Sequence, residues 1–519
     1  MDPSEHPELD ELLARIALTT DEARPDAVAK RHESGGRTAR ENIADLIDPG
    51  SFVEYGRFAV AAQRARRDLQ ELIERTPADG LIGGTARVNG DLFGDGAACA
   101  VISYDYTVIA GTQGALGHRK KDRLFELIER MRLPTVLYAE GGGGRPGDTD
   151  YPVVSALEVR AFALWAALSG LVPRIAVVNG RCFAGNAVLA GCSDLIVATE
   201  SSSLGMGGPA MIAGGGLGDV HPDEVGPSAM QSANGVIDVL VADEAEATAV
   251  AKRLVGYFQG RTAKFAAPDQ ELLRTVVPER QRRAYDPLPI VETICDSDSV
   301  TALREGFAPE MLTAIGRIEG RPVGVIANDS RHMAGAITSD ASDKAARLLQ
   351  LCEAFGLPVI SLVDTPGMMV GPKHEATGIV RHGSRLLLAG AALTVPLVAV
   401  VLRRGYGLGA QAMMAGSTHE PLLTVAWPSA HLGPMGLEGA VRLALRKELE
   451  AIDDEDEREQ RVRDLTAQAE ENAKALNSAT LFEIDDVIDP AETRHLIAST
   501  LAAAEGAERR QRPRFVDSW

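Results

Sequence analysis

The sequence is poor in aromatic residues, cysteines and positive charge, and each shortage excludes a class of protein. Phe, Trp and Tyr make up 4% of the 519 residues, so aliphatic cores are expected. The formal net charge is −20 and no basic stripe is interleaved with aromatics, which argues against nucleic acid as a partner. The five cysteines are scattered without CxxC spacing, which favours reduced core thiols over a disulfide framework or a zinc ribbon.

Uninterrupted apolar runs and metal-binding patterns are also missing. The longest apolar run, 386–402, contains Gly390, Thr394 and Pro396, which divide it into a helix and a strand rather than a membrane span. No cluster of His, Cys and carboxylates has metal-ligand spacing, so no metal is expected. The first residues, MDPSEHPELDELL, are acidic and amphipathic, unlike a signal peptide. These features favour a cytoplasmic protein with no membrane association.

What the chain does contain is one pattern twice. Residues 173–191, PRIAVVNGRCFAGNAVLAG, match residues 396–416, PLVAVVLRRGYGLGAQAMMAG, and in both a β-branched strand enters a glycine turn that begins a helix. Further matched pairs are GTARVNG with AIGRIEG, RLFELIERMRLPTVLYAEGGGG with KAARLLQLCEAFGLPVISLVDTPG, and SLGMGG with HLGPMG. A short insertion at residues 91–97 absorbs the one change in spacing. A period this long indicates duplicated domains, and the alternation of strands and helices indicates an α/β fold.

The repeat and the chain length together predict two domains. We place them at residues 1–275 and 276–519, with a charged, proline-containing linker around the boundary. The first domain is expected to begin with a helical arm in which Thr38 caps the helix containing Glu41. In the second, the highly charged stretch 446–476 is expected to form a solvated helical excursion.

The paired glycine turns suggest two sites that stabilise anions. A tight glycine turn at a helix start leaves backbone N–H groups unpaired and aimed in one direction. The positive end of the helix dipole lies behind them.

The chain resembles the carboxyltransferase β subunits of biotin-dependent acyl-CoA carboxylases, of the propionyl-CoA and methylcrotonyl-CoA carboxylase type. The resemblance runs from about residue 31 to residue 494 through RHESGGRTARENIADLIDPGSFVE, YDPLPIVETICD, GRPVGVIAND, SDASDKAARLLQLCEAFGLPVISLVDTPGMMVG, GIVRHGSRLLLAGAALTVP, VAWPSAHLGPMG and DDVIDPAETR. It implies two tandem crotonase-like domains of the ClpP/crotonase superfamily, which agrees with the duplication.

The resemblance also implies the chemistry. Carboxybiotin, delivered on a separate carrier protein, gives its CO2 to the α-carbon or vinylogous carbon of an acyl-CoA, and a nitrogen of biotin serves as the base. Two oxyanions need stabilising: the enolate of the thioester and the urea oxygen of biotin. By family position, the backbone N–H groups that do this are those of Gly185 and Asn186 in the first domain and of Gly409 and Ala410 in the second.

Other roles follow from the same resemblance. The expected CoA-binding residues are Arg119, Lys120, Lys121, Gly141, Gly142, Gly143 and Ala184. The basic members of this set belong to the segment HRKKDR, which is equally well explained as an ordinary solvated helix face. The expected residues of the acyl and biotin pocket are Phe183, Gly367, Tyr406, Leu408, Gln411 and Ala412. The small side chain of Ala412 favours a short or modest acyl chain.

The chain departs from the family pattern at two places. Asn186 stands where the family commonly has a second glycine, and its side chain either narrows the site or points away from it. The loop AEGGGGRPGDTD begins at Ala139, where relatives have an Asp-Ser-Gly-Gly-Ala type of loop.

No lysine has the methionine-flanked pattern of biotin attachment, and no GxxxxGK[ST] loop is present. A biotin carboxylase and a biotin carrier subunit are therefore expected as partners. The family's usual assembly is a hexamer, a trimer of dimers, which could be homomeric or mixed. Two alternatives are the α subunit of a biotin-dependent acyl-CoA decarboxylase in a membrane complex, and a non-catalytic scaffold subunit of a mixed carboxylase.

Overall fold

The computed structural model describes residues 6–145, 147–151, 157–278, 280–281 and 283–506. The chain forms two compact units that divide between Gly260 and Arg261. Each unit has its own sheet and its own aliphatic core. The boundary between the duplicated domains that the sequence predicts, between residues 275 and 276, stays a prediction.

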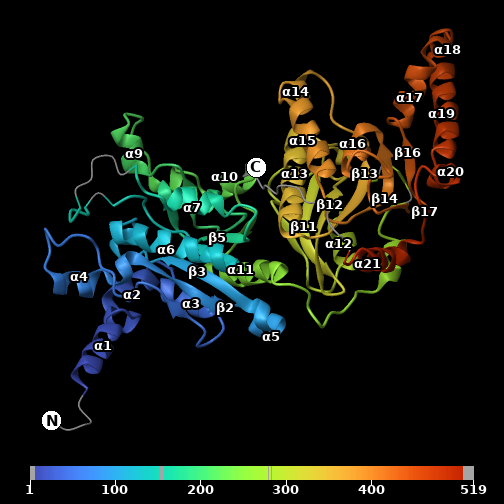
Figure 1. The fold of residues 1–519 in the computed structure, drawn as a ribbon. Helices are drawn as coiled ribbons and strands as arrows, with labels where there is room; N and C mark the ends of the chain where they lie inside the picture. Colours follow the sequence, from blue (N-terminus) through green and yellow to red (C-terminus); the bar gives the residue numbers. More distant parts are fainter. Residues whose placement is uncertain (1–5, 146, 152–156, 279, 282, 507–519) are drawn as a thin grey trace. The chain divides into compact units, whose positions relative to one another are not determined.

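The first unit is built on a seven-stranded sheet that is antiparallel at one edge and parallel elsewhere (Figure 1). In spatial order its strands are β1 (Val53–Glu54), β2 (Leu81–Arg87), β3 (Ala98–Tyr104), β4 (Thr135–Tyr138), β5 (Arg174–Val178), β7 (Leu195–Thr199) and β9 (Val239–Val241). A separate parallel pair consists of β6 (Arg181–Phe183) and β8 (Ser203–Gly205).

The helices of the first unit include the predicted N-terminal arm. They are α1 (Pro7–Ala17), α2 (Pro25–Glu33), α3 (Ala39–Leu46), α4 (Leu69–Arg75), α5 (Gly90–Phe93), α6 (Ala115–Met131), α7 (Ala161–Ala167), α8 (Gly185–Gly191), α9 (Pro209–Gly214), α10 (Ser228–Ala233) and α11 (Glu244–Phe258). The expected cap of α3 is confirmed: the Thr38 hydroxyl accepts from the Glu41 N–H, and the Glu41 carboxylate accepts from the Thr38 N–H.

The second unit repeats the plan with an eight-stranded sheet. Its strands are β10 (Thr301–Leu303), β11 (Met311–Ile318), β12 (Arg321–Asn328), β13 (Val359–Thr365), β14 (Leu397–Tyr406), β15 (Leu423–Ala426) and β17 (Asp486–Val487), with β16 (His431–Gly433) beside the end of β14. Its helices are α12 (Leu288–Ile294), α13 (Ser339–Phe355), α14 (Pro372–Glu375), α15 (Ile379–Ala391), α16 (Gly407–Met413), α17 (Leu437–Ala444), α18 (Arg446–Glu450), α19 (Glu455–Asn472), α20 (Ala475–Thr480) and α21 (Thr493–Ala503). Helices α13 and α15 pack side by side (Figure 1).

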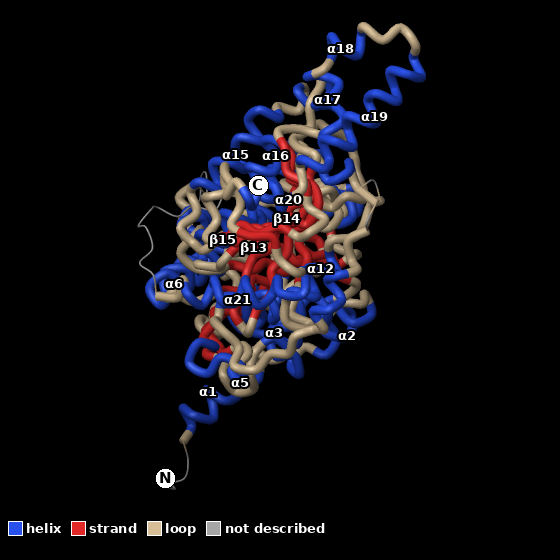
Figure 2. The backbone as a smooth tube through the Cα atoms, turned by 90° about the vertical axis from the view of Figure 1, so that its right-hand side faces the viewer, coloured by secondary structure: helices blue, strands red, loops and turns tan. Residues whose placement is uncertain are grey.

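The predicted helical excursion is confirmed. Helices α17, α18 and α19 project away from the sheet of the second unit (Figure 2). Salt bridges join α17 and α18 to α19, and Val462 is the only buried residue within α19. Among the described residues, no helix combines the length and the apolar character needed to cross a bilayer.

The predicted duplication is also visible in the backbone. In each unit an antiparallel hairpin, β2–β3 or β11–β12, passes into a parallel sheet. A short parallel pair then forms near the glycine turn, where Phe183 pairs with Gly205 and Tyr406 pairs with Gly433. The tripeptides 109–111 and 333–335 have positive φ at all three residues, a conformation that L residues rarely adopt.

A buried ion pair fixes the start of β5. The Asp194 carboxylate accepts from the backbone N–H and the guanidinium of Arg174, and the two side chains are 3% and 1% exposed. We expect Asp194→Ala to lower the free energy of unfolding by about 3–5 kcal/mol, because it leaves an unpaired guanidinium in the core. Urea unfolding followed by circular dichroism measures this change.

The matched control is Glu450→Ala, which removes one partner of the exposed pair with Arg446. This substitution should leave the unfolding midpoint unchanged because water screens exposed pairs. Equal midpoint shifts for the two variants would contradict the prediction.

Candidate functional site

In the first unit, the glycine turn lies where β6 passes into α8. Between Phe183 and Gly185, Ala184 adopts φ 52 and ψ −122, a conformation that is strained for a residue with a Cβ. The Ala184 N–H donates to the Gly205 carbonyl at 3.1 Å, which holds the turn against β8. Within the described residues, the N–H groups of Gly185 and Asn186 have no acceptor. The turn therefore presents two adjacent backbone donors at the start of a helix.

The second unit has a corresponding turn between β14 and α16. Gly407 follows Tyr406 with φ 58, and a Cβ there would lie 2.9 Å from the Pro434 carbonyl oxygen. A Cβ at Gly409 would lie 2.6 Å from the carbonyl carbon of Gly367. Two backbone segments thus meet here at a distance that only glycine permits.

The sequence prediction did not anticipate the register of the two turns. Ala184 and Gly407 correspond, because each follows the strand residue that pairs with β8 or β16. The predicted donors in the first unit, Gly185 and Asn186, are the first and second residues after Ala184. The predicted donors in the second unit, Gly409 and Ala410, are the second and third residues after Gly407. The two predicted pairs therefore differ in register by one residue. The second-unit residues that correspond to Gly185 and Asn186 are Leu408 and Gly409.

The glycine loop after β4 packs on the first turn. The Gly141 N–H donates to the Arg181 carbonyl at 2.7 Å, and the Gly141 carbonyl accepts from the Phe183 N–H at 3.0 Å. At Gly143 a Cβ would lie 2.7 Å from the Ala184 Cβ. The structure therefore brings together four of the predicted CoA-binding residues, Gly141, Gly142, Gly143 and Ala184.

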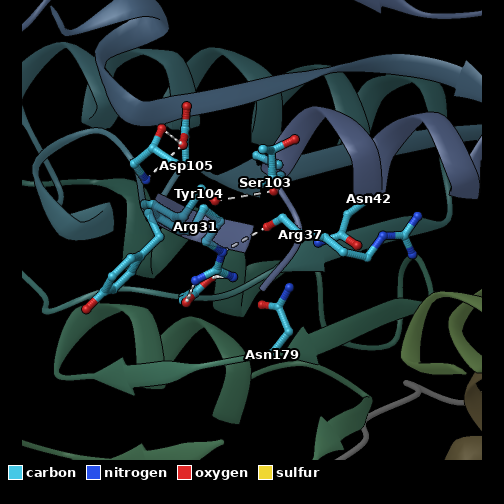
Figure 3. Close-up of a pocket in the computed structure, with 12 residues that line it drawn as sticks. Arg31, Arg37, Asn42, Ser103, Tyr104, Asp105 and Asn179 are labelled. Carbon is cyan, nitrogen blue, oxygen red and sulfur yellow. Dashed lines mark hydrogen bonds and ion pairs between the residues drawn. The ribbon is translucent and has the colours of Figure 1, made fainter. Parts of the chain in front are cut away.

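A buried carboxylate anchors this loop. Glu140 receives two hydrogen bonds of 2.8 Å from the Arg31 guanidinium, and Arg31 also contacts Glu244. Burial raises the pKa of the Glu140 carboxyl, and the charge of Arg31 opposes the rise. Arg31 comes from the arm, and it lies with Asn42 and Asn179 around a small polar pocket (Figure 3). The N-terminal arm thus holds the glycine loop in place through the ion pair between Arg31 and Glu140.

The side chain of Asn186 points into the protein. Its Oδ1 accepts from Gln113 Nε2 at 3.0 Å, and its Nδ2 donates to the carbonyls of Glu140 and Gly111 at 3.0 and 3.3 Å. The Gln113 Oε1 in turn accepts from Lys121 Nζ at 2.7 Å. Asn186 is fully buried, so it departs from the family pattern without covering the donors.

The basic segment on α6 divides into exposed and buried members. Arg119 is exposed and lies over the Tyr151 ring, with its guanidinium carbon 4.6 Å from the ring centre. Lys120 and Lys121 are buried, and their ammonium groups bond to backbone carbonyls and to Gln113, respectively. Burial lowers the pKa of Lys120 to about 8 and that of Lys121 to about 7. Of the three predicted residues Arg119, Lys120 and Lys121, Arg119 is the one whose side chain is exposed and able to meet a phosphate.

The predicted residues of the acyl and biotin pocket differ in exposure. Leu408 and Gln411 are exposed near the start of α16, and Leu408 is 65% exposed. Phe183, Tyr406 and Ala412 are buried, so Ala412 gives no measure of acyl length here. Burial also raises the pKa of Tyr406 to about 12, which suits a packing residue better than an acid or base. Gly367 lies against the turn, as described above.

Sequence reasoning missed Gln113, Glu140 and Arg31. Each acts through contacts with residues distant in the chain, and no local pattern marks them. In the described ranges, no group of three or more His, Cys, Asp or Glu side chains is placed to hold a metal ion.

Together, the repeated sheets and turns define a two-domain protein of the crotonase-like class, each domain carrying one donor turn. A family model described as "Carboxyl transferase domain" matches residues 30–516, and the chain belongs to this family.

Known proteins support this assignment over the whole chain. The chain is 34% identical to the methylmalonyl-CoA carboxyltransferase 12S subunit of Propionibacterium freudenreichii subsp. shermanii, over 91% of this chain and 90% of that protein. A transcarboxylase 12S crystal structure, described as a hexamer with methylmalonyl-CoA bound, matches with a TM-score of 0.84 and 30% identity, covering 99% and 98% of the two chains.

A third match is to a longer protein. The structure of a single-chain, multi-domain long-chain acyl-CoA carboxylase aligns with a TM-score of 0.92 and 53% identity. The match covers 96% of this chain and 49% of that one, so this chain spans about half the length of the multi-domain protein.

The contact between Gly409 and Gly367 leads to a stability prediction. We expect Gly409→Ala to lower the free energy of unfolding by about 1–3 kcal/mol, because the added methyl group forces two backbone segments apart. Gly436→Ala is the control, since no described residue other than its chain neighbours has an atom within 4 Å of a Cβ there. Thermal unfolding of both variants measures the effect. An unchanged midpoint for Gly409→Ala would show that the two segments separate freely.

Burial of Lys121 leads to a prediction about pH. Its pKa falls from an ordinary 10.5 to about 7, so from pH 7 to about pH 10 the unfolded chain binds a proton that the folded protein lacks. Stability contributed by this group therefore rises with pH in that window. We expect the free-energy advantage of Lys121→Met over the natural protein to be largest at pH 7. It should shrink by up to about 1.4 kcal/mol per pH unit above that.

Urea unfolding of the two proteins across this pH range measures the difference, in which contributions from other buried lysines cancel. An advantage that does not change with pH would show that Lys121 keeps an ordinary pKa.

Proposed function

We propose that this chain is the carboxyltransferase subunit of an acyl-CoA carboxylase. It moves a carboxyl group from carboxybiotin on a carrier protein to the α-carbon or vinylogous carbon of an acyl-CoA. The observation that carries the proposal is the pair of donor turns, Ala184–Asn186 and Gly407–Gly409, within a chain that matches the carboxyl transferase family from residue 30 to 516. The reaction develops negative charge on two oxygens, and each turn offers backbone donors for one of them.

The first turn fits the thioester. The N–H groups of Gly185 and Asn186 would hold the thioester oxygen as the enolate forms, and a site of this kind supplies about 3–4 kcal/mol of transition-state stabilisation. The glycine loop at residues 141–143 lies beside these donors with no side chains to obstruct a CoA thioester. Arg119, the accessible cation of the predicted set, is available for a CoA phosphate.

The second turn fits the urea oxygen of biotin. Its donors are at the start of α16, where Gly407 and Gly409 pack directly against the backbone of Pro434 and Gly367. Ala410 remains in the proposal as predicted, and the register described above adds Leu408. When bound, carboxybiotin supplies the CO2, and its nitrogen accepts the α-proton as the new carbon–carbon bond forms.

The partners follow from this assignment. A biotin carboxylase and a biotinylated carrier would supply carboxybiotin, and the hexamer described for the 12S relative is the assembly we propose for this chain, as a homo-hexamer or a mixed one. A cytoplasmic location belongs to the same proposal. No specific observation favours a decarboxylase, and the scaffold alternative loses its main motive because the Asn186 side chain turns away from the donors.

The decisive test is ATP-dependent incorporation of labelled bicarbonate into acyl-CoAs from acetyl to palmitoyl, together with 3-methylcrotonyl-CoA. The assay combines this protein with a biotin carboxylase and its biotinylated carrier. We expect acid-stable label on at least one acyl-CoA, and a loss of about 100-fold or more in Gly185→Pro, which removes one donor. Gly436→Ala should retain full activity because, apart from its chain neighbours, no described residue has an atom within 4 Å of a Cβ at that position.

A carboxylated carrier without label on any acyl-CoA would overturn the proposal. Full activity in Gly185→Pro would preserve the function but assign the oxyanion to other donors.

A further inference from the structure

A continuous chain of side-chain hydrogen bonds connects the inside of α6 to the first donor turn. Lys121 Nζ donates to Gln113 Oε1 at 2.7 Å, Gln113 Nε2 donates to Asn186 Oδ1 at 3.0 Å, and Asn186 Nδ2 donates to Glu140 O at 3.0 Å. A second branch runs from Asn186 Nδ2 to Gly111 O at 3.3 Å. All three side chains of this relay are at most 5% exposed.

Lys121 gives the relay its direction. Its Nζ donates at one end, so Gln113 turns its oxygen to Lys121 and its NH2 to Asn186. Asn186 must then turn its oxygen to Gln113 and its NH2 to the two carbonyls. With the amides reversed, the Asn186 oxygen would face two carbonyl oxygens. The Lys121 donor at one end and the two carbonyl acceptors at the other therefore fix the orientation of Gln113 and Asn186, and Asn186 carries one of the donor N–H groups.

The relay also joins the two segments that form the site. The Gln113 backbone N–H donates to the Gly143 carbonyl at 2.7 Å. A Cβ at Gly185 would lie 3.0 Å from both Gln113 Nε2 and Phe162 Cζ, so the amide packs directly over the donor turn. Movement of Gln113 would consequently disturb the turn and the glycine loop together.

The second unit shows that the fold itself does not require the relay. The residues corresponding to Lys121, Gln113 and Asn186 are Ala345, Ile337 and Gly409, none of which has a polar side chain. The same backbone hydrogen bond in both units establishes this correspondence. The Ile337 N–H donates to Gly367 O at 3.0 Å, just as the Gln113 N–H donates to Gly143 O. By contrast, the neighbouring Lys120 has a counterpart in Lys344, and both donate to backbone carbonyls. Lys120 is therefore part of the shared scaffold, and Lys121 is specific to the first turn.

Among the residues that the structure describes, no carboxylate contacts the Lys121 ammonium group. Its Nζ lies 5.7 Å from the centre of the Tyr104 ring and 6.0 Å from that of Phe162. The charged groups that act on it from a longer distance are Asp122 and Asp79. Burial, and then the charges of Lys121 and Arg145, lower the pKa of the nearby His118. Burial makes this charge unfavourable, as the low pKa of Lys121 shows. The second unit has no lysine at the corresponding position, so the fold does not need this energetically unfavourable buried group. A role in the first site explains Lys121 better than a role in stability does.

We infer that Lys121 is a positioning residue, which acts through Gln113 and Asn186 to hold the first donor turn in the orientation that stabilises the enolate of an acyl-CoA. This inference rests on the proposed function of that turn. It differs from the predicted role of Lys121 in contacting CoA phosphate, because Lys121 is 1% exposed and its Nζ donates to Gln113.

The test compares Lys121→Met with Lys120→Met in the full-length protein. Two quantities are measured: the rate of acyl-CoA carboxylation, and the affinity for a nitroalkyl thioether of CoA, whose nitronate anion mimics the enolate. For Lys121→Met we expect kcat and nitronate affinity to fall about tenfold, less than the loss of a direct donor. The KM for acyl-CoA should change less than about twofold, because the CoA contacts remain. Lys120→Met should lower stability while kcat stays within about twofold of the natural protein.

A double-mutant cycle with Asn186→Gly isolates the relay. This substitution keeps the backbone donor but removes the last link, so adding Lys121→Met to it should change kcat less than about twofold. A full tenfold loss in that background would overturn the inference, as would unchanged kcat and nitronate affinity in Lys121→Met alone.

Failure of the proposed function gives a different result. In that case the natural protein would neither carboxylate an acyl-CoA nor bind the nitronate analogue, and a catalytic role for Lys121 would fail with it. Hydrogen exchange then still decides whether the relay exists. If it does, Lys121→Met speeds exchange at residues 111–113 and 141–144, and Lys120→Met does not. Unchanged exchange in both variants would show that Lys121 does not hold these segments.

Discussion

The site in each unit depends on how closely backbone segments approach at the ends of parallel strands. In the first unit, a Cβ at Gly141 would lie 2.1 Å from the Gly111 carbonyl oxygen, and in the second a Cβ at Gly409 would overlap Gly367. Such contacts leave no side chains between the segments, so peptide groups line the site. N–H groups fixed in this way need no reorganisation when charge develops beside them, which is the basis of oxyanion stabilisation by backbone.

Close backbone packing needs an anchor, and the two units use the same kind of group for it. Glu140 and Asp364 are buried carboxylates just before the glycine loops, and a left-handed glycine, Gly111 or Gly335, packs on the carbonyl of each. The cations differ in origin. Asp364 is paired with arginines of its own sheet, on β14, whereas Glu140 is paired with Arg31 from the N-terminal arm. The arm therefore belongs to the structure of the first site.

The duplication, the α/β architecture, the capped arm helix and the projecting charged helices could all be predicted from the sequence, because each has a local or periodic signal. The glycine turns were found for the same reason. The burial of Lys120 and Lys121 could not be predicted from HRKKDR, because the sequence does not show which of several adjacent charged residues on a helix tertiary packing will bury. Likewise, the sequence match aligned the two turns one residue out of step, because glycine and alanine recur there at several spacings. Only strand pairing at Phe183 and Tyr406 resolves it.

The two halves also show what duplication allows a site to change. The scaffold elements persist in both, including the left-handed tripeptides, the buried carboxylates and the lysines 120 and 344. The side chains behind the turns do not: polar Asn186 and Gln113 stand where the second unit has Gly409 and Ile337. In the proposed reaction both oxygens become negative, so fixed backbone donors suit both turns. The first turn also has a polar support, because Lys121 and Gln113 hold Asn186, whereas the apolar Ile337 lies at the corresponding place in the second unit.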